Sequence, residues 1–229
     1  QTKNISREVK PEDTSFDITS VKSAVETCMR STLLEALVVV GQQGGFYQKP
    51  RREIWEDNLS FLPYYAVDGV VAIPPLKTIE EEISMYIDDY LETCTQKGFT
   101  QFPIFSFNTK QPSATTSITD ADVILSVRYS IVIVKGELTR TLDTFQIREE
   151  DIRIKNLYDF IVDSKDAFGA SQICTSCVEK NAEFHDLYVI FKEVPTNSFI
   201  VSITDLNSRF KDEPYEYVFA VHVQGGQNE

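Results

Sequence analysis

The stretch VKSAVETCMRSTLLEALVVVGQQGGFY, residues 21–47, decides the fold of this chain. Apolar and small residues recur in it at spacings of three and four, which places them on one side of an α-helix: Val21, Val25, Cys28, Thr32, Ala36 and Val39. From Leu34 onward the pattern is apolar on almost every side, which predicts burial on several faces. Gly41, or Gly44 with Gly45, is expected to end the helix, because glycine adopts the left-handed conformation without a Cβ clash.

The first residues of this helix and its charged residues indicate where it begins and whether it lies in a membrane or in a protein core. Thr19 or Ser20 is expected to cap its first turn, because a short hydroxyl side chain accepts a hydrogen bond from a free backbone N–H. The stretch is too short for a bilayer span and carries Arg30 and Glu35, so the pattern favours a buried core helix.

A second helix is expected over Thr78–Cys94. The pair Pro74-Pro75 precedes it, and Thr78 with Glu81 forms the pattern of a capping box. Its apolar face has helical spacing and consists of Ile79, Ile83, Tyr86, Ile87, Tyr90 and Cys94. The acidic residues in this stretch are interpreted as its solvated face: Glu80, Glu81, Glu82, Asp88 and Asp89.

After residue 101 the period changes to the alternation of β-strands. Strands are expected at 60–65, 69–73, 102–107, 123–134, 138–147, 187–194, 199–204 and 215–223. The alternation slips near Asp143, which indicates a bulge, and further helices are expected over 156–168 and after Cys174. This order predicts an α+β fold in which the paired helices pack on a mostly antiparallel sheet of about five to six strands.

Composition and length limit the classes of function. The chain has 229 residues, of which 42% are hydrophobic and 11% aromatic, a balance typical of globular proteins. Residues 1–17 are interpreted as a flexible tether, 18–223 as a single domain and 224–229 as a disordered tail. The net charge of −13 repels phosphate, so we expect no nucleic-acid partner and no binding to an anionic membrane surface.

The four cysteines indicate an oxidising location. Cys28 lies near the start of the first helix and Cys94 at the end of the second, both on apolar faces. If the helices pack antiparallel, the two thiols meet, and a bridge closes a loop of about 66 residues, worth up to roughly 4 kcal/mol. We therefore predict a disulfide between them.

Cys174 and Cys177 form the spacing C-x-x-C, which has three interpretations. A structural disulfide, or a pair of half-buried thiols, is the first. A zinc site with His185 and Asp186 is the second, although a further C-x-x-C or paired histidines are missing. A thiol–disulfide exchange site is the third, because a helix N-terminus lowers the pKa of a thiol, although the βαβ setting of thioredoxin-like folds is missing.

Other chemistry-bearing patterns are few. The chain has two histidines, His185 and His222, without a partner identifiable by spacing, and it lacks the common nucleotide, hydrolase and metalloprotease motifs. We therefore predict no catalytic residue, no metal ligand and no cofactor. The sequence favours a protein without enzymatic activity over an enzyme. Asn4 and Asn58 each begin a glycosylation sequon, which is meaningful only in an exported chain.

The segment 46–76 is rich in aromatic residues and proline. Its rings either cover the core as part of an irregular connection or form an exposed recognition surface. The candidates for such a surface are Trp55, Tyr64 and Tyr65.

Several strings together resemble an uncharacterised family of secreted or membrane-anchored proteins from small-genome archaea. They are, in order along the chain, VETC at 25–28, GQQGGFY at 41–47, LPYY at 62–65, ICTSC at 173–177 and EPYEYVFA at 213–220, with the spaced residues Pro75, Leu76, Ile79, Glu80, Ile83, Tyr86, Ile87, Leu91 and Cys94. The resemblance spans nearly everything after Ser20.

The resemblance implies a location and supplies no activity. Members of this family look like single-pass proteins in which a short hydrophobic helix, similar to an archaeal pilin signal, precedes an external domain. This chain would then be the extracellular domain of a protein anchored to the cell membrane by that helix. The expected function is binding, adhesion or an envelope role, with an unknown protein or glycan as partner. A thiol–disulfide oxidoreductase and a pilin-like structural subunit are the alternatives.

Overall fold

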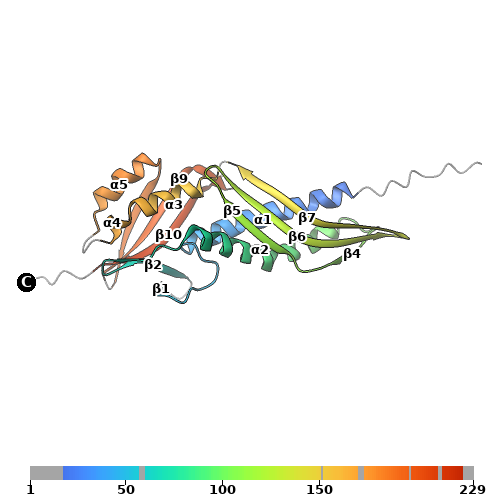
Figure 1. Ribbon diagram of the computed structural model, residues 1–229, viewed down its shortest axis with the longest axis horizontal. Helices are drawn as coiled ribbons and strands as arrows, with labels where there is room; N and C mark the ends of the chain where they lie inside the picture. The colour runs from blue at the N-terminus through green and yellow to red at the C-terminus, as the bar shows by residue number, and fades with distance from the viewer. Residues whose placement is uncertain are drawn as a thin grey trace, which may run out of the picture.

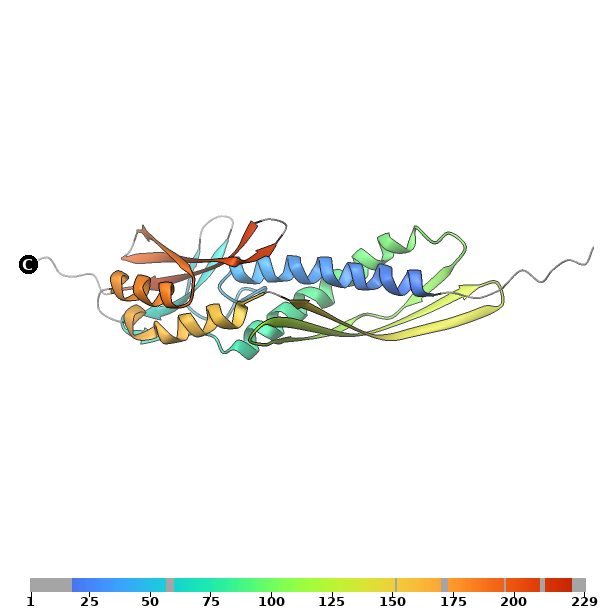
Figure 2. The same cartoon turned by 90° about the horizontal axis from the view of Figure 1, so that it is seen from above.

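The computed structural model of the chain describes residues 18–56, 60–150, 152–169, 173–195, 197–210 and 213–223. Within these ranges it forms an α+β fold with five helices, a six-stranded sheet and a four-stranded sheet. The molecule is elongated, and the two sheets lie toward its opposite ends (Figures 1 and 2). The predicted tether, the tail and the sequons at Asn4 and Asn58 lie outside the described residues.

Two long helices, α1 (Thr19–Gln42) and α2 (Leu76–Phe99), run antiparallel and pack against each other (Figure 2). The predicted disulfide between them is confirmed, since Cys28 and Cys94 are bonded with their α-carbons 5.7 Å apart. The side of α1 that faces the core is apolar apart from Thr32, and it includes Val21, Val25, Met29, Leu33 and Leu37, all unexposed. The helical period therefore identified the buried face of α1 correctly.

Both predictions of a side-chain helix cap are wrong. α1 follows Ile18 and α2 follows Pro75, and neither start has a side-chain cap hydrogen bond. Thr78 lies inside the first turn of α2, where its N–H donates to the carbonyl of Pro75 at 2.9 Å. The helix begins as soon as the proline pair ends, so the threonine is already too far along to cap it.

The glycines after α1 end it as predicted. Gly44 and Gly45 have φ angles of +58° and +85°, and the N–H of Gly45 donates to the carbonyl of Val40 at 2.8 Å. A Cβ on Gly45 would lie 2.6 Å from the hydroxyl oxygen of Tyr217. Backbone angle and close packing therefore both require glycine at this position.

The four-stranded sheet contains β4 (Ser106–Thr109), β5 (Ser113–Ile118), β6 (Asp122–Lys135) and β7 (Leu138–Glu150). β6 pairs with β7 on one side and with β4 and β5 on the other. Its alternate residues from Val123 to Ile133 are buried, and the hydroxyl of Tyr129 lies 2.8 Å from that of Thr95 on α2. The predicted bulge lies at the expected place, because the register shifts where Leu142 and Thr144 of β7 pair with β6.

The six-stranded sheet has the order β1–β2–β10–β9–β8, and β3 pairs with β2. Its strands are β1 (Ile54–Glu56), β2 (Phe61–Val67), β3 (Val70–Val71), β8 (Tyr188–Val194), β9 (Ser198–Phe210) and β10 (Glu213–His222). All pairs are antiparallel except β2 with β10. The strands were expected in one sheet; they form two, joined through a continuous apolar core.

Three short helices lie together beside the six-stranded sheet: α3 (Ile154–Asp163), α4 (Lys165–Phe168) and α5 (Thr175–Phe184) (Figures 1 and 2). The single helix expected over 156–168 is broken at Ser164, which is buried and accepts a hydrogen bond from Asn181 at 2.8 Å. Phe160 and Phe168 on either side of the break are unexposed or nearly so, and the break lets both rings enter the core.

One face of α2 closes the edge of β5. The outward N–H groups of Ala114, Thr116 and Ile118 donate to side chains of α2 at 2.6, 2.9 and 2.8 Å. The acceptors are Asp88, Ser84 and Glu80, one turn apart along the helix. These acidic residues therefore do not form a solvated face as predicted; they protect a strand edge that could pair with another chain.

The prediction that Glu82 lies on a solvated face is also wrong. It is 9% exposed, and its carboxylate accepts the backbone N–H groups of Tyr47 and Gln48 at 2.9 and 3.0 Å. This carboxylate therefore fixes the path of the chain after the glycine turn.

Replacing Asp88 tests the closed edge. Asp88→Ala removes the acceptor of the Ala114 N–H, and we expect the free energy of unfolding to fall by about 1–3 kcal/mol. Asp88→Asn keeps a carbonyl oxygen at this position and removes the charge. The pKa of Asp88 is raised, mainly by burial, so its ionised form is disfavoured in the folded protein.

The sign of the pH dependence follows from this shift. Ionised Asp88 lowers the free energy of unfolding because burial disfavours its charge. This loss is absent below the pKa that Asp88 has in the unfolded chain, near 4, and reaches its full size above the higher pKa that it has in the folded protein. Asp88→Asn should therefore equal the wild type in acid and be at least as stable at neutral pH. Urea unfolding of both variants at the two pH values measures this. An asparagine variant that loses as much stability as the alanine variant at neutral pH would contradict it.

Candidate functional site

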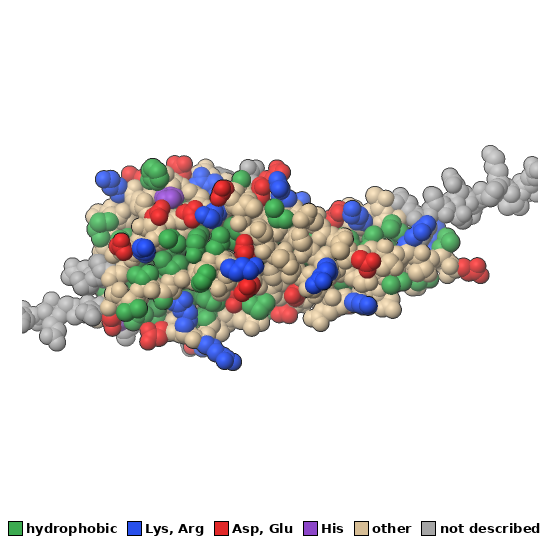
Figure 3. Space-filling model, in the orientation of Figure 1, with side chains coloured by type: hydrophobic (Ala, Val, Ile, Leu, Met, Phe, Trp, Pro, Cys, Tyr) green, Lys and Arg blue, Asp and Glu red, His purple; other side chains and the backbone are tan. Residues whose placement is uncertain are grey.

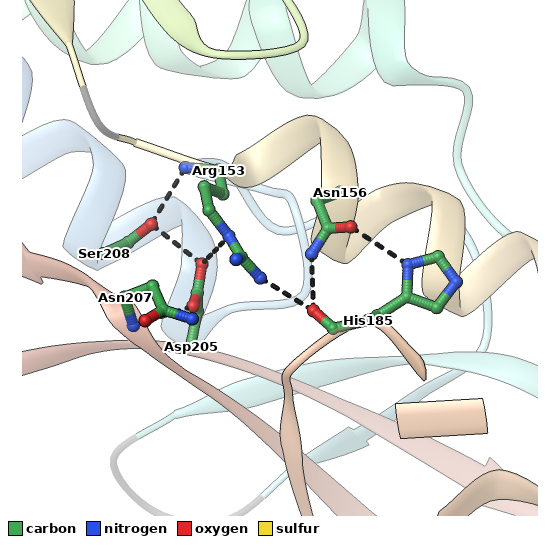
Figure 4. Close-up of polar contacts among 6 residues, drawn as sticks. All are labelled: Arg153, Asn156, His185, Asp205, Asn207 and Ser208. Carbon is green, nitrogen blue, oxygen red and sulfur yellow. Dashed lines mark hydrogen bonds and ion pairs between the residues drawn. The ribbon is translucent and has the colours of Figure 1, made fainter. Parts of the chain in front are cut away.

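A buried polar network links α3, α5 and β9 (Figure 4). Asp205 is unexposed and accepts hydrogen bonds from Arg153 Nε at 3.2 Å, Ser208 Oγ at 2.8 Å and the Asn207 N–H at 3.0 Å. Arg153 also donates to the carbonyl of His185 at 2.7 Å. The side chain of Arg153 thus joins the start of α3 to the C-terminal end of α5, and the buried carboxylate of Asp205 joins it to β9.

The two polar ends of this network are His185 with Asn156, and Ser208. Asn156 Nδ2 donates to the carbonyl of His185, and the two side chains meet at 3.0 Å through Nδ1 (Figure 4). The other ring nitrogen of His185, Nε2, is buried and makes no hydrogen bond among the described residues, and the nearest carboxylate oxygen, Asp163 Oδ2, lies 3.6 Å away. Ser208 donates to Asp205 and is 0% exposed, so a substrate cannot reach its hydroxyl.

A second constellation joins Ser198, His222 and Asp68. Ser198 Oγ lies 3.2 Å from His222 Nδ1 and 3.1 Å from the hydroxyl of Tyr64, and His222 Nε2 lies 3.5 Å from Asp68. These residue types can form a nucleophilic triad. Ser198 is 0% exposed, however, so a substrate cannot reach its hydroxyl, and the arrangement fixes β2, β9 and β10 to one another. Spacing along the sequence gave no sign of this contact.

The C-x-x-C pair is a disulfide between Cys174 and Cys177 at the start of α5. Its sulfurs are bonded to each other, which excludes them as thiolate ligands and makes the predicted zinc alternative with His185 and Asp186 wrong for this state. Among the described residues no group of three or more potential ligands is placed to hold a metal. A hollow of about 390 Å³ lies beside the disulfide and includes Asp163 and Asn181.

The predicted aromatic surface is only partly present. Tyr65 is 1% exposed, because its hydroxyl enters the core to donate to the carbonyl of Gly44 at 3.0 Å and meets the hydroxyl of Tyr217 at 2.7 Å. The prediction of an exposed Tyr65 is therefore wrong. Trp55 and Tyr64 are half-buried, so they do not form a broad open surface.

An apolar hollow lies between the C-terminal half of α1 and the start of β10. It has a volume of about 550 Å³, and its apolar lining consists of Leu34, Val38, Val39, Tyr86, Pro214 and Tyr215. The residues of α1 were predicted to be buried on several sides, but Leu34, Val38 and Val39 are only half-buried because they line this groove. We call it the α1–β10 groove.

Three carboxylates surround the α1–β10 groove: those of Glu35, Glu213 and Glu216, all on exposed residues. Glu216 accepts a hydrogen bond from Ser202. None of the groove's ten lining residues, all within the described chain, is Lys, Arg or His. Glu35 and burial together raise the pKa of Tyr86, with burial the larger cause. The groove is thus apolar inside and negative at its rim.

Comparison of the chain with protein-family models, with curated proteins and with solved structures gives no match. Of the helices in the described ranges, none combines the length and hydropathy that a bilayer span requires. The function must therefore be argued from the geometry of the molecule itself.

Proposed function

We propose that this chain is an extracellular binding or adhesion domain without enzymatic activity, carried on the outside of the cell. The single observation that carries the proposal is the Cys28–Cys94 disulfide, which bonds the two main helices. The second disulfide uses the remaining two cysteines, so no free thiol remains. Disulfides persist in oxidising locations and are rare where glutathione and thioredoxin keep thiols reduced.

Two further features support binding over catalysis. The serine of the Ser198–His222–Asp68 constellation is inaccessible, whereas the α1–β10 groove is open and has an apolar interior. On the face seen in Figure 3, hydrophobic side chains gather over the end of the molecule that carries α4 and β2. Apolar surface that remains exposed on a folded protein is typical of contact with a partner. An archaeal source, a membrane anchor and glycosylation stay predictions.

The proposal is tested by the state of the thiols in protein isolated from cells under alkylating conditions. Intact mass is measured after alkylation without reductant and again after reduction. We expect no alkyl group in the first sample and four in the second, one for each cysteine. Four alkylated thiols in the unreduced sample would overturn the extracellular assignment. Antibody labelling of intact cells that express the full gene then tests the location directly.

A thiol–disulfide oxidoreductase is the second candidate. The observation that favours it is the exposed position of Cys177 at the start of α5, beside the hollow that includes Asp163. A helix N-terminus stabilises a thiolate formed there on reduction. Insulin reduction by the wild type and by Cys174→Ser decides this candidate. Equal inactivity of both proteins removes it and leaves the leading proposal unchanged.

A further inference from the structure

We propose that the α1–β10 groove binds a partner's polypeptide segment that carries lysine or arginine next to bulky apolar side chains. This inference deepens the proposed function, on which it rests for the extracellular origin of the partner.

The charge of the groove selects a cationic ligand. Glu35 and Glu213 stand on opposite walls, and neither has an ion-pair partner among the described residues. Carboxylates at an apolar site attract a cation more strongly than they do in open solvent, because the local dielectric constant is lower. The net charge of −13 adds a long-range attraction for positively charged partners.

The apolar interior selects the rest of the ligand. Leu34 and Val38 are one turn apart on α1, and their half-buried side chains pack on the core while remaining part of the groove wall. A volume of about 550 Å³ lies within the range of sites that bury most of a small ligand or a few side chains. A purely polar cation would leave this wall exposed to water, so bulky apolar side chains fit better.

Aromatic rings continue the groove along α2. Tyr86 lines it, and the ring of Tyr90 lies 4.5 Å from that of Tyr86, centroid to centroid. The ring of Tyr47 lies 5.1 Å from Tyr86, and its hydroxyl donates to Asp89 at 3.0 Å. A guanidinium or ammonium group over these rings gains cation–π attraction beside a carboxylate. This arrangement suits arginine or lysine side chains.

A second copy of the chain is disfavoured as the occupant. Each copy carries a net charge of −13, so two copies repel each other, and an acidic rim does not complement a second acidic protein. The observations therefore point to a different, basic partner.

The test uses purified full-length chain and three capped pentapeptides as probes: KLRFK, the acidic ELQFE and the apolar-depleted KGRGK. Isothermal titration and amide chemical shifts measure affinity and position. We expect KLRFK alone to bind, with shifts at 34–42 and 213–216, and binding should weaken as salt is added. Glu35→Gln combined with Glu213→Gln should weaken binding about tenfold, and Val38→Lys should abolish it.

The matched control is Glu137→Gln combined with Glu179→Gln, which removes the same charge from exposed positions outside the groove lining. It should bind KLRFK like the wild type, and unchanged thermal unfolding checks that the groove variants fold. Equal binding of all three peptides, or binding insensitive to the groove variants, would overturn the inference. The thiol experiment is independent of this one, so the groove can fail while the extracellular assignment stands.

Discussion

Cys28→Ala combined with Cys94→Ala is expected to lower the free energy of unfolding by about 4 kcal/mol. The bond spans 66 residues, and removing it restores the conformational freedom of that large loop to the unfolded chain. Cys28 is also 7% exposed between the helices, so the smaller alanines leave a packing defect. Urea unfolding followed by circular dichroism measures the loss.

The matched control is Cys174→Ala combined with Cys177→Ala. That bond spans three residues, so its loss should cost about 2 kcal/mol at most. Hydrogen exchange locates the effect, because amides in the first turns of α1 should exchange faster only in the Cys28 and Cys94 variant. If both double variants lost the same stability, the long loop would not be the source of the stabilisation.

The features predicted correctly from the sequence are those that the spacing of apolar residues within one helix or one strand defines. The apolar stripe of α1 and that of α2 both contain a cysteine, and antiparallel packing was enough to bring Cys28 to Cys94. β6 was found because every second residue from Val123 to Ile133, six in all, has an apolar or aromatic side chain.

The features that the sequence did not predict depend on contacts between polar side chains and distant parts of the chain. β5 has the sequence SATTSI, without an apolar alternation that would mark a strand. The period of α2 shows correctly that Asp88 and Glu80 lie off its apolar face, but it carries no information on the strand edge opposite them. The extension of β9 beyond Thr204 was missed for the same reason, since its residues are mostly polar.

The candidate sites were harder to predict than the fold. The α1–β10 groove joins α1 to residues 213–216, which lie more than 170 positions later in the sequence. The sequence predicted that α1 is apolar on almost every side from Leu34 onward and therefore buried. Leu34 and Val38 are only half-buried, and the position of β10 makes them part of a groove. The sequence therefore predicted the apolar residues of α1 that line the groove, but it did not predict the groove.

Asp205→Ala is expected to destabilise the protein by about 3–5 kcal/mol, because it removes an unexposed carboxylate and leaves the partly buried guanidinium of Arg153 without its partner. Asp205 is unexposed, and three donors converge on its carboxylate, from Arg153, Asn207 and Ser208. Truncation removes all three acceptor contacts at once and leaves the donors of a buried site unsatisfied.

An exposed ion pair on α3 serves as the control, because it has the same charges as the Arg153–Asp205 pair without the burial of the carboxylate. Lys155 and Asp159 of α3 form an ion pair at 2.6 Å, but Asp159 is 43% exposed, so Asp159→Ala should cost at most about 0.5 kcal/mol. Combining Arg153→Ala with Asp205→Ala should recover part of the loss, because the unpaired cation is removed as well. Urea unfolding of the four proteins in this cycle measures the coupling. If the two single losses were simply additive, Asp205 would not act through Arg153, and the network would hold α3 and α5 to β9 through the serine and backbone contacts alone.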